Sequence, residues 1–297
     1  MSHGARPPPR LWRSLHGLLP RRWRRPQPIS EGLWRHTLSQ LPFLGSLDRI
    51  EQQGLQLLCS HFLQEKEFHG ANGLRITDAM ALSIAAQACL PLLHLTTPPE
   101  CPDARMRIRA LDWYDDFVGI VVHPGAVLAR REFIDAAGLV HRYEEALAGE
   151  AMSQGPLMLS WDAVEHAGES AAAGTNLVIH EFAHKIDMRG MVRSDRPDGA
   201  PALRAGSLGQ PTARAAREHW RSVMQDAYDR FRESLAMAER FGGEQPWLDA
   251  YAAHDPAEFF AVTCEAYFVN RARFSENFPD LRGLYDAFFL SGTQTAP

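Results

Sequence analysis

The spacing of apolar residues predicts that the first third of the chain is mainly helical. From Leu41 to Leu63 the apolar positions recur near the helical period, and glycines within residues 70–73 then break the pattern. A second helix is expected after Thr77, which is a good N-cap, and it should run to Leu93. Because apolar side chains cover almost the whole of this second helix, we expect it to be buried.

The pattern changes from helical to extended after the prolines at residues 98–99. Residues 117–122 are typical of a strand, and residues 139–147 and 156–161 are two further strand candidates. We interpret residues 156–161 either as a core strand or as a sheet edge that pairs with an extended peptide. Three short strands ahead of another buried helix, residues 176–188, predict an α+β fold.

The last third of the chain is again helical in its pattern. Residues 189–211 are rich in Gly, Pro and Arg, which is typical of a mobile surface loop or a lid. A long amphipathic helix should follow over residues 212–241 and end at a pair of glycines. Another helix is expected to begin at Asp255, a good N-cap, with Pro256 at its first position.

Charge is distributed unevenly along the chain. Residues 1–30 contain seven Arg and six Pro but no acidic residue, which is typical of a disordered basic leader; the alternative is a leader that makes weak contact with a membrane or a polyanion. Removing those seven positive charges from the net charge of −5 leaves about −12 for residues 31–297, and this acidity argues against direct nucleic-acid binding. The leader has no apolar stretch like that of a secretory signal, and no run of 18 apolar residues predicts a membrane span.

The breaks in the pattern predict three parts: the leader at 1–30, a helical unit at 31–104, and an α+β unit at 105–297. The overall composition, 45% apolar and 23% charged, is that of a soluble globular protein. The four cysteines form no C-x-x-C pair, so we expect reduced, buried thiols in a cytoplasmic protein, at Cys59, Cys89, Cys101 and Cys264.

The main chemical signal is an H-E-x-x-H motif formed by His180, Glu181 and His184. On a helix, residues four apart share a face, so both imidazoles can bind one Zn²⁺ at about 2.0–2.1 Å. Glu181 is then placed to take a proton from a water molecule at the metal. The apolar flanks predict a buried helix, in which a metal would satisfy the polar side chains; the alternative is a structural His pair with protein partners.

A catalytic zinc usually has a third protein ligand, and the motif does not supply it. The metzincin pattern is excluded, because Asp187 and Gly190 occupy the positions where it requires Gly and His. Glu258 and Glu265 are the main candidates, but they lie about 10 Å apart along a helix and cannot both bind one ion. Glu258 could instead complete a capping box, Glu265 could hold a ligand histidine, and His254 could be either a ligand or a surface residue.

Four segments, taken together, resemble the Mlc titration factor A family, glucose-regulated zincin metallopeptidases of bacteria. The resemblance runs from about residue 41 to 289. It is carried by the segments Ile84-Ala85-Ala86-Gln87-Ala88-Cys89-Leu90-Pro91-Leu92-Leu93, Gly155-Pro156-Leu157-Met158-Leu159-Ser160-Trp161, His180-Glu181-Phe182-Ala183-His184-Lys185-Ile186-Asp187 and Ala250-Tyr251-Ala252-Ala253-His254-Asp255-Pro256-Ala257-Glu258-Phe259-Phe260-Ala261-Val262.

The resemblance implies a role for each site residue. His180, His184 and Glu258 would bind zinc, and Glu181 would be the general base. Tyr251 would direct its hydroxyl at the metal and stabilise the oxyanion formed at the scissile carbonyl. The fold implied is a helical N-terminal unit followed by a zincin-like catalytic domain with a small mixed sheet.

The resemblance also implies substrates and partners. It suggests aminopeptidase-type cleavage of short peptides in the cytoplasm, with a role in regulating sugar uptake. It suggests as an alternative an anti-repressor that binds an Mlc-like transcriptional repressor independently of zinc. The sequence departs from the family pattern in the Arg-rich leader and in the length and content of residues 189–211.

Overall fold

The computed structural model describes residues 26–98, 103–134, 140–147, 149–151, 155–191 and 197–296, with only the backbone for residues 127–134, 140–147 and 150. Most of the expected leader, with its seven arginines, and Cys101 therefore lie outside the described residues. The helices are α2 (Glu31–Gln40), α3 (Arg49–Glu65), α4 (Asp78–Cys89), α5 (Ala104–Ile108), α6 (Trp161–Glu165), α7 (Ala167–Ser170), α8 (Leu177–Met188), α9 (Ala213–Phe241), α10 (Pro256–Val269), α11 (Arg271–Asn277) and α12 (Pro279–Phe289). The strands are β1 (Glu67–Gly70), β2 (Gly119–His123), β3 (Val127–Ile134), β4 (Val140–Leu147), β5 (Gly149–Ala151) and β6 (Leu157–Ser160).

The N-terminal helices begin at side chains that satisfy free backbone N–H groups. Asp48 and Glu51 form a capping box at the start of α3, and the Thr77 hydroxyl accepts a hydrogen bond from Met80 N at the start of α4. The predicted N-cap at Thr77 is therefore confirmed, and α4 is buried along most of its length. The sequence analysis missed α2, which begins ten residues before the expected start at Leu41.

Four strands form one sheet in the order β1-β2-β6-β5. β1, β2 and β6 are parallel, and the short β5 pairs antiparallel with β6, so the sheet is mixed. β6 has a neighbour on each side, so residues 156–161 form a core strand and their interpretation as a sheet edge was wrong. β1 comes from the expected helical unit, so the sheet includes residues from both sides of position 104; the division of the chain into units stays a prediction.

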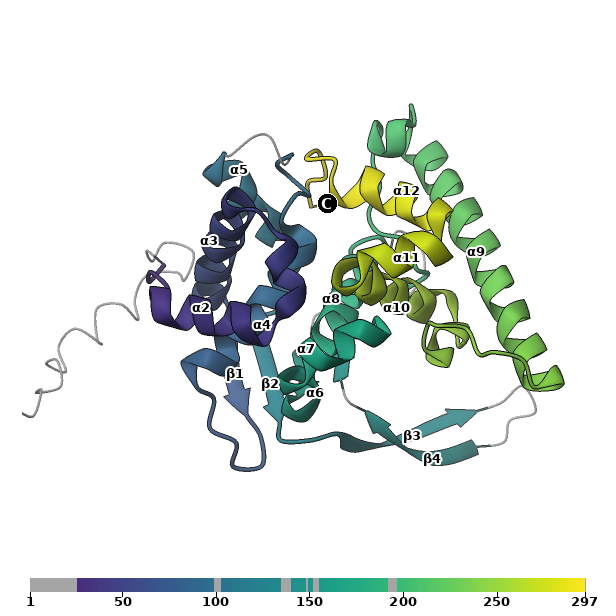
Figure 1. The fold of residues 1–297 in the computed structure, drawn as a ribbon, viewed down its shortest axis with the longest axis horizontal. Helices are drawn as coiled ribbons and strands as arrows, with labels where there is room; N and C mark the ends of the chain where they lie inside the picture. The colour runs from purple at the N-terminus through teal and green to yellow at the C-terminus, as the bar shows by residue number, and fades with distance from the viewer. Residues whose placement is uncertain are drawn as a thin grey trace, which may run out of the picture.

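β3 and β4 form a separate antiparallel hairpin that runs along one side of the molecule (Figure 1). Their register runs from Val127 opposite Leu147 to Ile134 opposite Val140. The strand predicted over residues 139–147 is thus confirmed from Val140 onward, whereas β1, β3 and β5 were not predicted.

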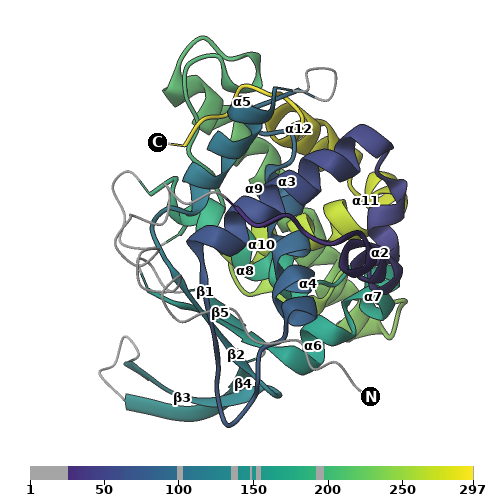
Figure 2. The ribbon, with the colours of Figure 1, turned by 90° about the vertical axis from the view of Figure 1, so that its left-hand side faces the viewer.

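α8 lies between the N-terminal helices and the C-terminal helices, as two perpendicular views show (Figures 1 and 2). It contacts α4 on one side and α10 on the other. The Phe182 ring anchors it in the core, with ring-centroid distances of 5.7 Å to Phe62, 4.8 Å to Tyr114 and 5.9 Å to Phe117. This packing fixes the orientation of the helix that carries the H-E-x-x-H motif.

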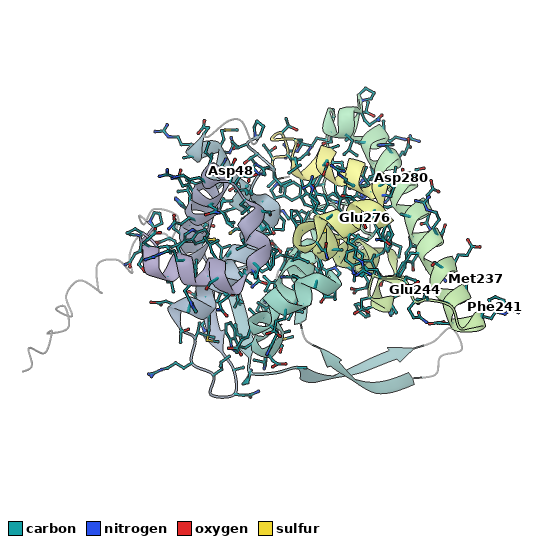
Figure 3. The ribbon with its side chains drawn as sticks, viewed as in Figure 1. Asp48, Met237, Phe241, Glu244, Glu276 and Asp280 are labelled. Atoms are coloured by element: carbon teal, nitrogen blue, oxygen red, sulfur yellow. The ribbon has the colours of Figure 1, made fainter. Side chains whose placement is uncertain are left out.

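α9 confirms the predicted long amphipathic helix. It buries Trp220 and ends at Gly242, whose φ of 68° is the left-handed conformation that glycine adopts readily. Its last turns extend beyond the core, where Met237 and Phe241 are 54% and 65% exposed (Figure 3). Among the described residues, no helix combines the length and the apolar character needed to cross a lipid bilayer.

Candidate metal centre

Two histidines of α8 direct their side chains to the same point. The side chain of Asn176 caps the helix by accepting a hydrogen bond from Ile179 N at 2.9 Å. One turn apart, His180 and His184 lie on one face of α8, with their ring centroids 4.8 Å apart and their Nε2 atoms separated by 3.1 Å. The helix spacing expected from the sequence is therefore realised.

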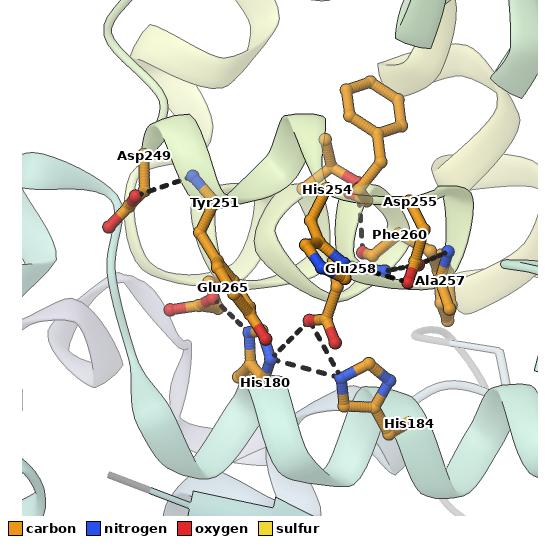
Figure 4. Close-up of polar contacts among 12 residues, drawn as sticks. His180, His184, Asp249, Tyr251, His254, Asp255, Ala257, Glu258, Phe260 and Glu265 are labelled. Carbon is orange, nitrogen blue, oxygen red and sulfur yellow. Dashed lines mark hydrogen bonds and ion pairs between the residues drawn. The ribbon is translucent and has the colours of Figure 1, made fainter. Parts of the chain in front are cut away.

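α10 brings Glu258 to the same point. Asp255 caps this helix by accepting hydrogen bonds from Ala257 N and Glu258 N. Glu258 Oε2 lies 3.1 Å from His180 Nε2 and 3.3 Å from His184 Nε2 (Figure 4). The carboxylate thus faces the two histidines and does not complete a capping box. His180, His184 and Glu258 form a group that could hold a metal ion, with one ligand atom from each within 4.8 Å of the others.

Glu265, seven residues further along α10, contacts the opposite edge of the His180 ring. Its Oε1 lies 2.7 Å from His180 Nδ1, and its Oε2 accepts a hydrogen bond from Asn176 N. An ionised Glu265 accepts the Nδ1 proton, so Nε2 is the ring nitrogen that can give up its proton and bind a metal ion. Glu265 therefore orients a histidine, which was one of the two alternatives to its being a ligand.

Sequence reasoning missed Gln87, which supports the same network from α4. Gln87 Oε1 accepts a hydrogen bond from Asn176 Nδ2 at 2.8 Å, and Gln87 is fully buried. The available signal was a single amide within an otherwise apolar helix, because a buried amide needs a hydrogen-bonding partner. Gln87 and Glu265 hold Asn176, and with it the start of α8, from two different helices.

Burial and hydrogen bonding shift the pKa values of the groups in this centre in opposite directions. Burial works to raise the pKa of Glu258, but its hydrogen bonds with His180 and His184 lower it overall. Burial works to lower the pKa of His180, but hydrogen bonds with Glu258 and Glu265 raise it well above its usual value. A cation bound here would compete with the imidazole protons, so metal binding should release protons.

Glu181 lies beside the three converging residues and is buried against the sheet. It is 4% exposed, and its carboxylate makes no hydrogen bond with any residue that the structure describes. Burial raises its pKa. The backbone of β5 approaches it so closely that a Cβ added at Gly149 would stand 2.3 Å from Glu181 Oε1.

A cleft of about 610 Å³ reaches this group at His180. Its lining includes Gly149, His180, Glu181, Tyr251 and Glu265. The Tyr251 side chain extends toward His180, with the two ring centroids 6.1 Å apart (Figure 4). The structure thus brings Tyr251, predicted as an oxyanion donor, to the same cleft as Glu181.

His254, the other ligand candidate, lies outside the converging group. Its side chain is 68% exposed, its Nδ1 is 3.2 Å from Asp255 Oδ2, and its ring stacks on Tyr251. The surface-residue alternative is therefore the one that the structure supports.

Asp187 ties the end of α8 to the loop that follows. Its carboxylate accepts hydrogen bonds from Gly199 N at 2.8 Å and Ala200 N at 3.1 Å, and burial raises its pKa to about 7. Ala200 and Leu203 are buried. This section of residues 189–211 is thus anchored in the core and is not the mobile surface loop that its composition suggested; a role as a lid stays untested.

Comparison with known proteins extends over nearly the whole chain. Residues 18–290 match the sequence profile of the family described as glucose-regulated metallo-peptidase M90. The chain is 34% identical over 250 residues to Mlc titration factor A of Cronobacter sakazakii, covering 84% of this chain and 82% of that protein. It is 32% identical over 256 residues to the protein of the same name from Escherichia coli, covering 86% and 84% of the two chains. It is 31% identical over 269 residues to that of Pectobacterium atrosepticum, covering 90% and 89%. These matches and the geometry of the site agree with the resemblance inferred from the motifs, and the chain belongs to the M90 family of glucose-regulated metallo-peptidases.

Proposed function

We propose that the protein is a zinc-dependent, gluzincin-like metallopeptidase that removes residues from the N-terminus of short peptides in the cytoplasm. The observation that carries the proposal is the convergence of two imidazole nitrogens and one carboxylate oxygen beside Glu181, a buried carboxylate that lines a cleft and makes no hydrogen bond with a described residue. The thiols of Cys59, Cys89 and Cys264 are free and buried, which is consistent with a reducing compartment.

The distances between the three ligand atoms suit a tetrahedral zinc. Ligand atoms bound at about 2.0–2.1 Å in a tetrahedron lie about 3.3 Å from one another. The separations among His180 Nε2, His184 Nε2 and Glu258 Oε2 are 3.1, 3.1 and 3.3 Å. Three protein ligands also leave the fourth position open, as catalytic zinc sites require.

Zinc at this position would supply Lewis-acid polarisation of the peptide carbonyl and a lowered pKa for water. The residues of the chain would carry the proton transfers. Glu181, whose pKa burial raises, would accept a proton from the attacking water and deliver it to the departing amine. Glu265 would keep His180 in the tautomer that leaves Nε2 free to bind the ion.

Tyr251 would stabilise the charge that develops on the substrate carbonyl oxygen. Its ring lies beside His180, and its phenol lines the same cleft as Glu181. A hydroxyl donor placed at this oxygen acts on the transition state more than on the substrate, so it should raise kcat and leave substrate affinity almost unchanged.

β5 offers a position for the substrate backbone. It pairs on one side with β6, and none of the other described strands occupies its second side. An extended peptide could pair with this free edge, which lies against Glu181 at Gly149. Pairing with an extended peptide, which was one of the two interpretations of residues 156–161, would instead take place at residues 149–151.

The proposal is tested by Glu181→Gln, measured for metal content and peptide hydrolysis together. The purified wild type should contain close to one zinc per chain and hydrolyse short peptides with free N-termini. Glu181→Gln should keep the zinc and lose about 10²- to 10⁴-fold in kcat. Normal turnover in this variant would remove Glu181 from the mechanism, and a wild type without zinc or activity would refute the proposed enzyme.

A second candidate function is that of an anti-repressor, and the relatives favour it because they are named Mlc titration factor A. We propose that the chain sequesters an Mlc-like transcriptional repressor and so affects sugar uptake. The net charge of about −12 over residues 31–297 suits a basic DNA-binding partner. Exposed apolar side chains next to acidic ones, such as Met237 and Phe241 near Glu244, offer contact area (Figure 3).

Titration calorimetry with a purified repressor of this class would separate the two functions. If binding needs no catalysis, metal-free wild type and Glu181→Gln should bind as tightly as the zinc-loaded enzyme. A loss of binding in the metal-free protein, with binding kept by Glu181→Gln, would show that the partner recognises the metal-loaded site. No binding in any form would refute this function.

A further inference from the structure

Tyr251, the proposed oxyanion donor, has a fixed backbone but a partly exposed side chain. Its N–H donates a hydrogen bond to Asp249 Oδ1 at 2.9 Å, and its carbonyl accepts one from His254 N at 3.0 Å, which closes the short turn Ala250–Ala253. The tyrosine itself is 42% exposed. Since a side chain on a fixed backbone can still occupy several staggered rotamers, the phenol needs further contacts that select the one in which it faces the cleft.

Two imidazole rings contact the ring of Tyr251. The centroid of the His180 ring lies 6.1 Å from that of Tyr251, at an interplanar angle of 38°. The centroid of the His254 ring lies 5.8 Å from that of Tyr251 at an interplanar angle of 21°, so these two rings stack. The orientation of His180 is already set by its contacts with Glu258 and Glu265. His254 lies outside the group of converging ligand atoms, so its stacking contact needs a separate explanation.

The ring of His254 is anchored to the start of α10, although its side chain is 68% exposed. Its Nδ1 lies 3.2 Å from Asp255 Oδ2. The other oxygen of this carboxylate, Oδ1, accepts hydrogen bonds from two backbone N–H groups at the start of α10, one of them that of Glu258. The Tyr228 hydroxyl donates to the carbonyl of Ala253 at 3.0 Å and so fixes the backbone just before His254. The imidazole therefore keeps a defined position relative to the helix that carries Glu258.

We propose that His254 is a positioning residue, whose imidazole stacks on Tyr251 and holds the phenol in the rotamer that faces His180 and the cleft. The inference rests on the proposed peptidase function, in which Tyr251 stabilises the oxyanion. The residues that line the cleft include Tyr251 but not His254, so His254 acts through Tyr251 and not on the substrate. Figure 4 shows the Tyr251 side chain extending toward His180 from the turn that ends at His254.

The expected size of the effect follows from the strength of one aromatic contact. Losing such a contact changes the balance between a held rotamer and the alternatives by about 3- to 10-fold. Because kcat depends on the fraction of enzyme molecules with the Tyr251 hydroxyl in place, kcat should fall by a similar factor. KM should change little, since the hydroxyl acts on the transition state more than on the bound substrate.

The test measures peptide hydrolysis and zinc content in His254→Ala and His254→Phe, each with and without Tyr251→Phe. His254→Ala removes the stacking ring and should lower kcat about 3- to 10-fold, with KM and zinc content near wild type. His254→Phe keeps an aromatic face and should restore most of kcat. In the Tyr251→Phe background, His254→Ala should cause no further loss, because the hydroxyl that it positions is absent. His69→Ala is the matched control, since that side chain is 61% exposed and its Nε2 also lies beside a carboxylate, 3.4 Å from Glu67 Oε2.

A fluorine NMR measurement reports on the contact without turnover. The chain has six tyrosines, so protein labelled with 3-fluorotyrosine should give six signals, and Tyr251→Phe identifies the one that belongs to Tyr251. That signal should move toward its position in the unfolded protein in His254→Ala and stay in place in His69→Ala. A signal that does not move in His254→Ala would overturn the stacking contact.

The kinetic outcomes separate this inference from the proposed function. Wild-type kcat in His254→Ala, no recovery in His254→Phe, or an equal further loss in the Tyr251→Phe background would each overturn the positioning role and leave the peptidase standing. A loss of zinc in His254→Ala would show that His254 supports the ligands and would overturn the role as well. A wild type that hydrolyses no peptide would overturn the proposed function together with this inference.

Discussion

The close approach of β5 to the proposed general base predicts what one added methyl group would do. A Cβ at position 149 would stand 2.3 Å from Glu181 Oε1 and 2.7 Å from its Cδ, whereas ordinary contact begins at 3.4 Å. The difference between 3.4 and 2.3 Å means that Gly149→Ala must displace the carboxylate by about 1 Å. The group that moves is the end of a flexible side chain, so the fold itself should tolerate the change.

Gly149→Ala should therefore reduce kcat with little effect on metal content. A misplacement of about 1 Å in a reacting group can cost about 100-fold in rate, and this is the loss expected here. The assay is steady-state hydrolysis of a peptide with a free N-terminus, run with zinc content and urea unfolding on the same preparations. Gly125→Ala is the matched control, because a Cβ at that glycine would meet nothing within 4 Å.

Wild-type kcat in Gly149→Ala, with metal bound and the fold intact, would show that the position of the Glu181 carboxylate does not limit the reaction. A loss of metal together with activity would instead show that β5 supports the ligands themselves. An equal loss of activity in Gly125→Ala would point to a general sensitivity of this region and would also refute the contact as the cause.

Three further predictions address the ligands, the oxyanion donor and the core. Tyr251→Phe should lower kcat about 100- to 1000-fold while KM and zinc content stay near wild type, as measured by initial rates; an unchanged kcat would remove the hydroxyl from the mechanism. Glu258→Ala should abolish zinc binding, whereas Glu265→Ala should keep zinc with affinity lowered about 10- to 100-fold in a competition assay against a chromophoric chelator; the reverse order would exchange their roles. Burial lowers the pKa of Lys66 from 10.5 to about 8, so between these pH values the folded state releases its proton before the unfolded chain does. The free energy of unfolding of wild type should thus rise by up to about 3 kcal/mol relative to Lys66→Met from pH 8 to 10.5, and parallel urea-unfolding profiles of the two proteins would contradict this.

The sequence predicted those elements whose signal lies within a few adjacent residues. The caps at Thr77 and Asp255 and the glycine that ends α9 each act on the backbone of their own helix, so local chemistry was sufficient to place them. β5 could not be found in this way, because three residues that begin with Gly149 carry no alternating pattern. Its position depends on pairing with β6, which only the folded chain establishes.

The loop after α8 shows how composition alone can mislead. Gly, Pro and Arg indicate a solvated connection, but two backbone N–H groups of this segment, on Gly199 and Ala200, donate to the buried Asp187. A buried carboxylate that accepts two backbone hydrogen bonds holds the loop against α8, because charge-assisted hydrogen bonds are stronger than neutral ones. The partners are 12 and 13 residues apart, a separation at which sequence patterns carry no information on contact.

The choice between Glu258 and Glu265 could not be made from their spacing, and the structure shows why. Seven residues separate them on one face of α10, a rise of about 10 Å, so we expected at most one to lie at the metal. The imidazole of His180 stands between them and contacts both, Glu258 through Nε2 at 3.1 Å and Glu265 through Nδ1 at 2.7 Å. The two carboxylates are too far apart to bind the same ion, but both can contact the His180 ring, one at each nitrogen. Glu258 therefore lies at the metal position, and Glu265 orients the ring. Since the two tasks require the same residue type at the same helical face, spacing alone cannot separate them, whereas the family resemblance and the position of α8 against α10 both assign Glu258 to the metal.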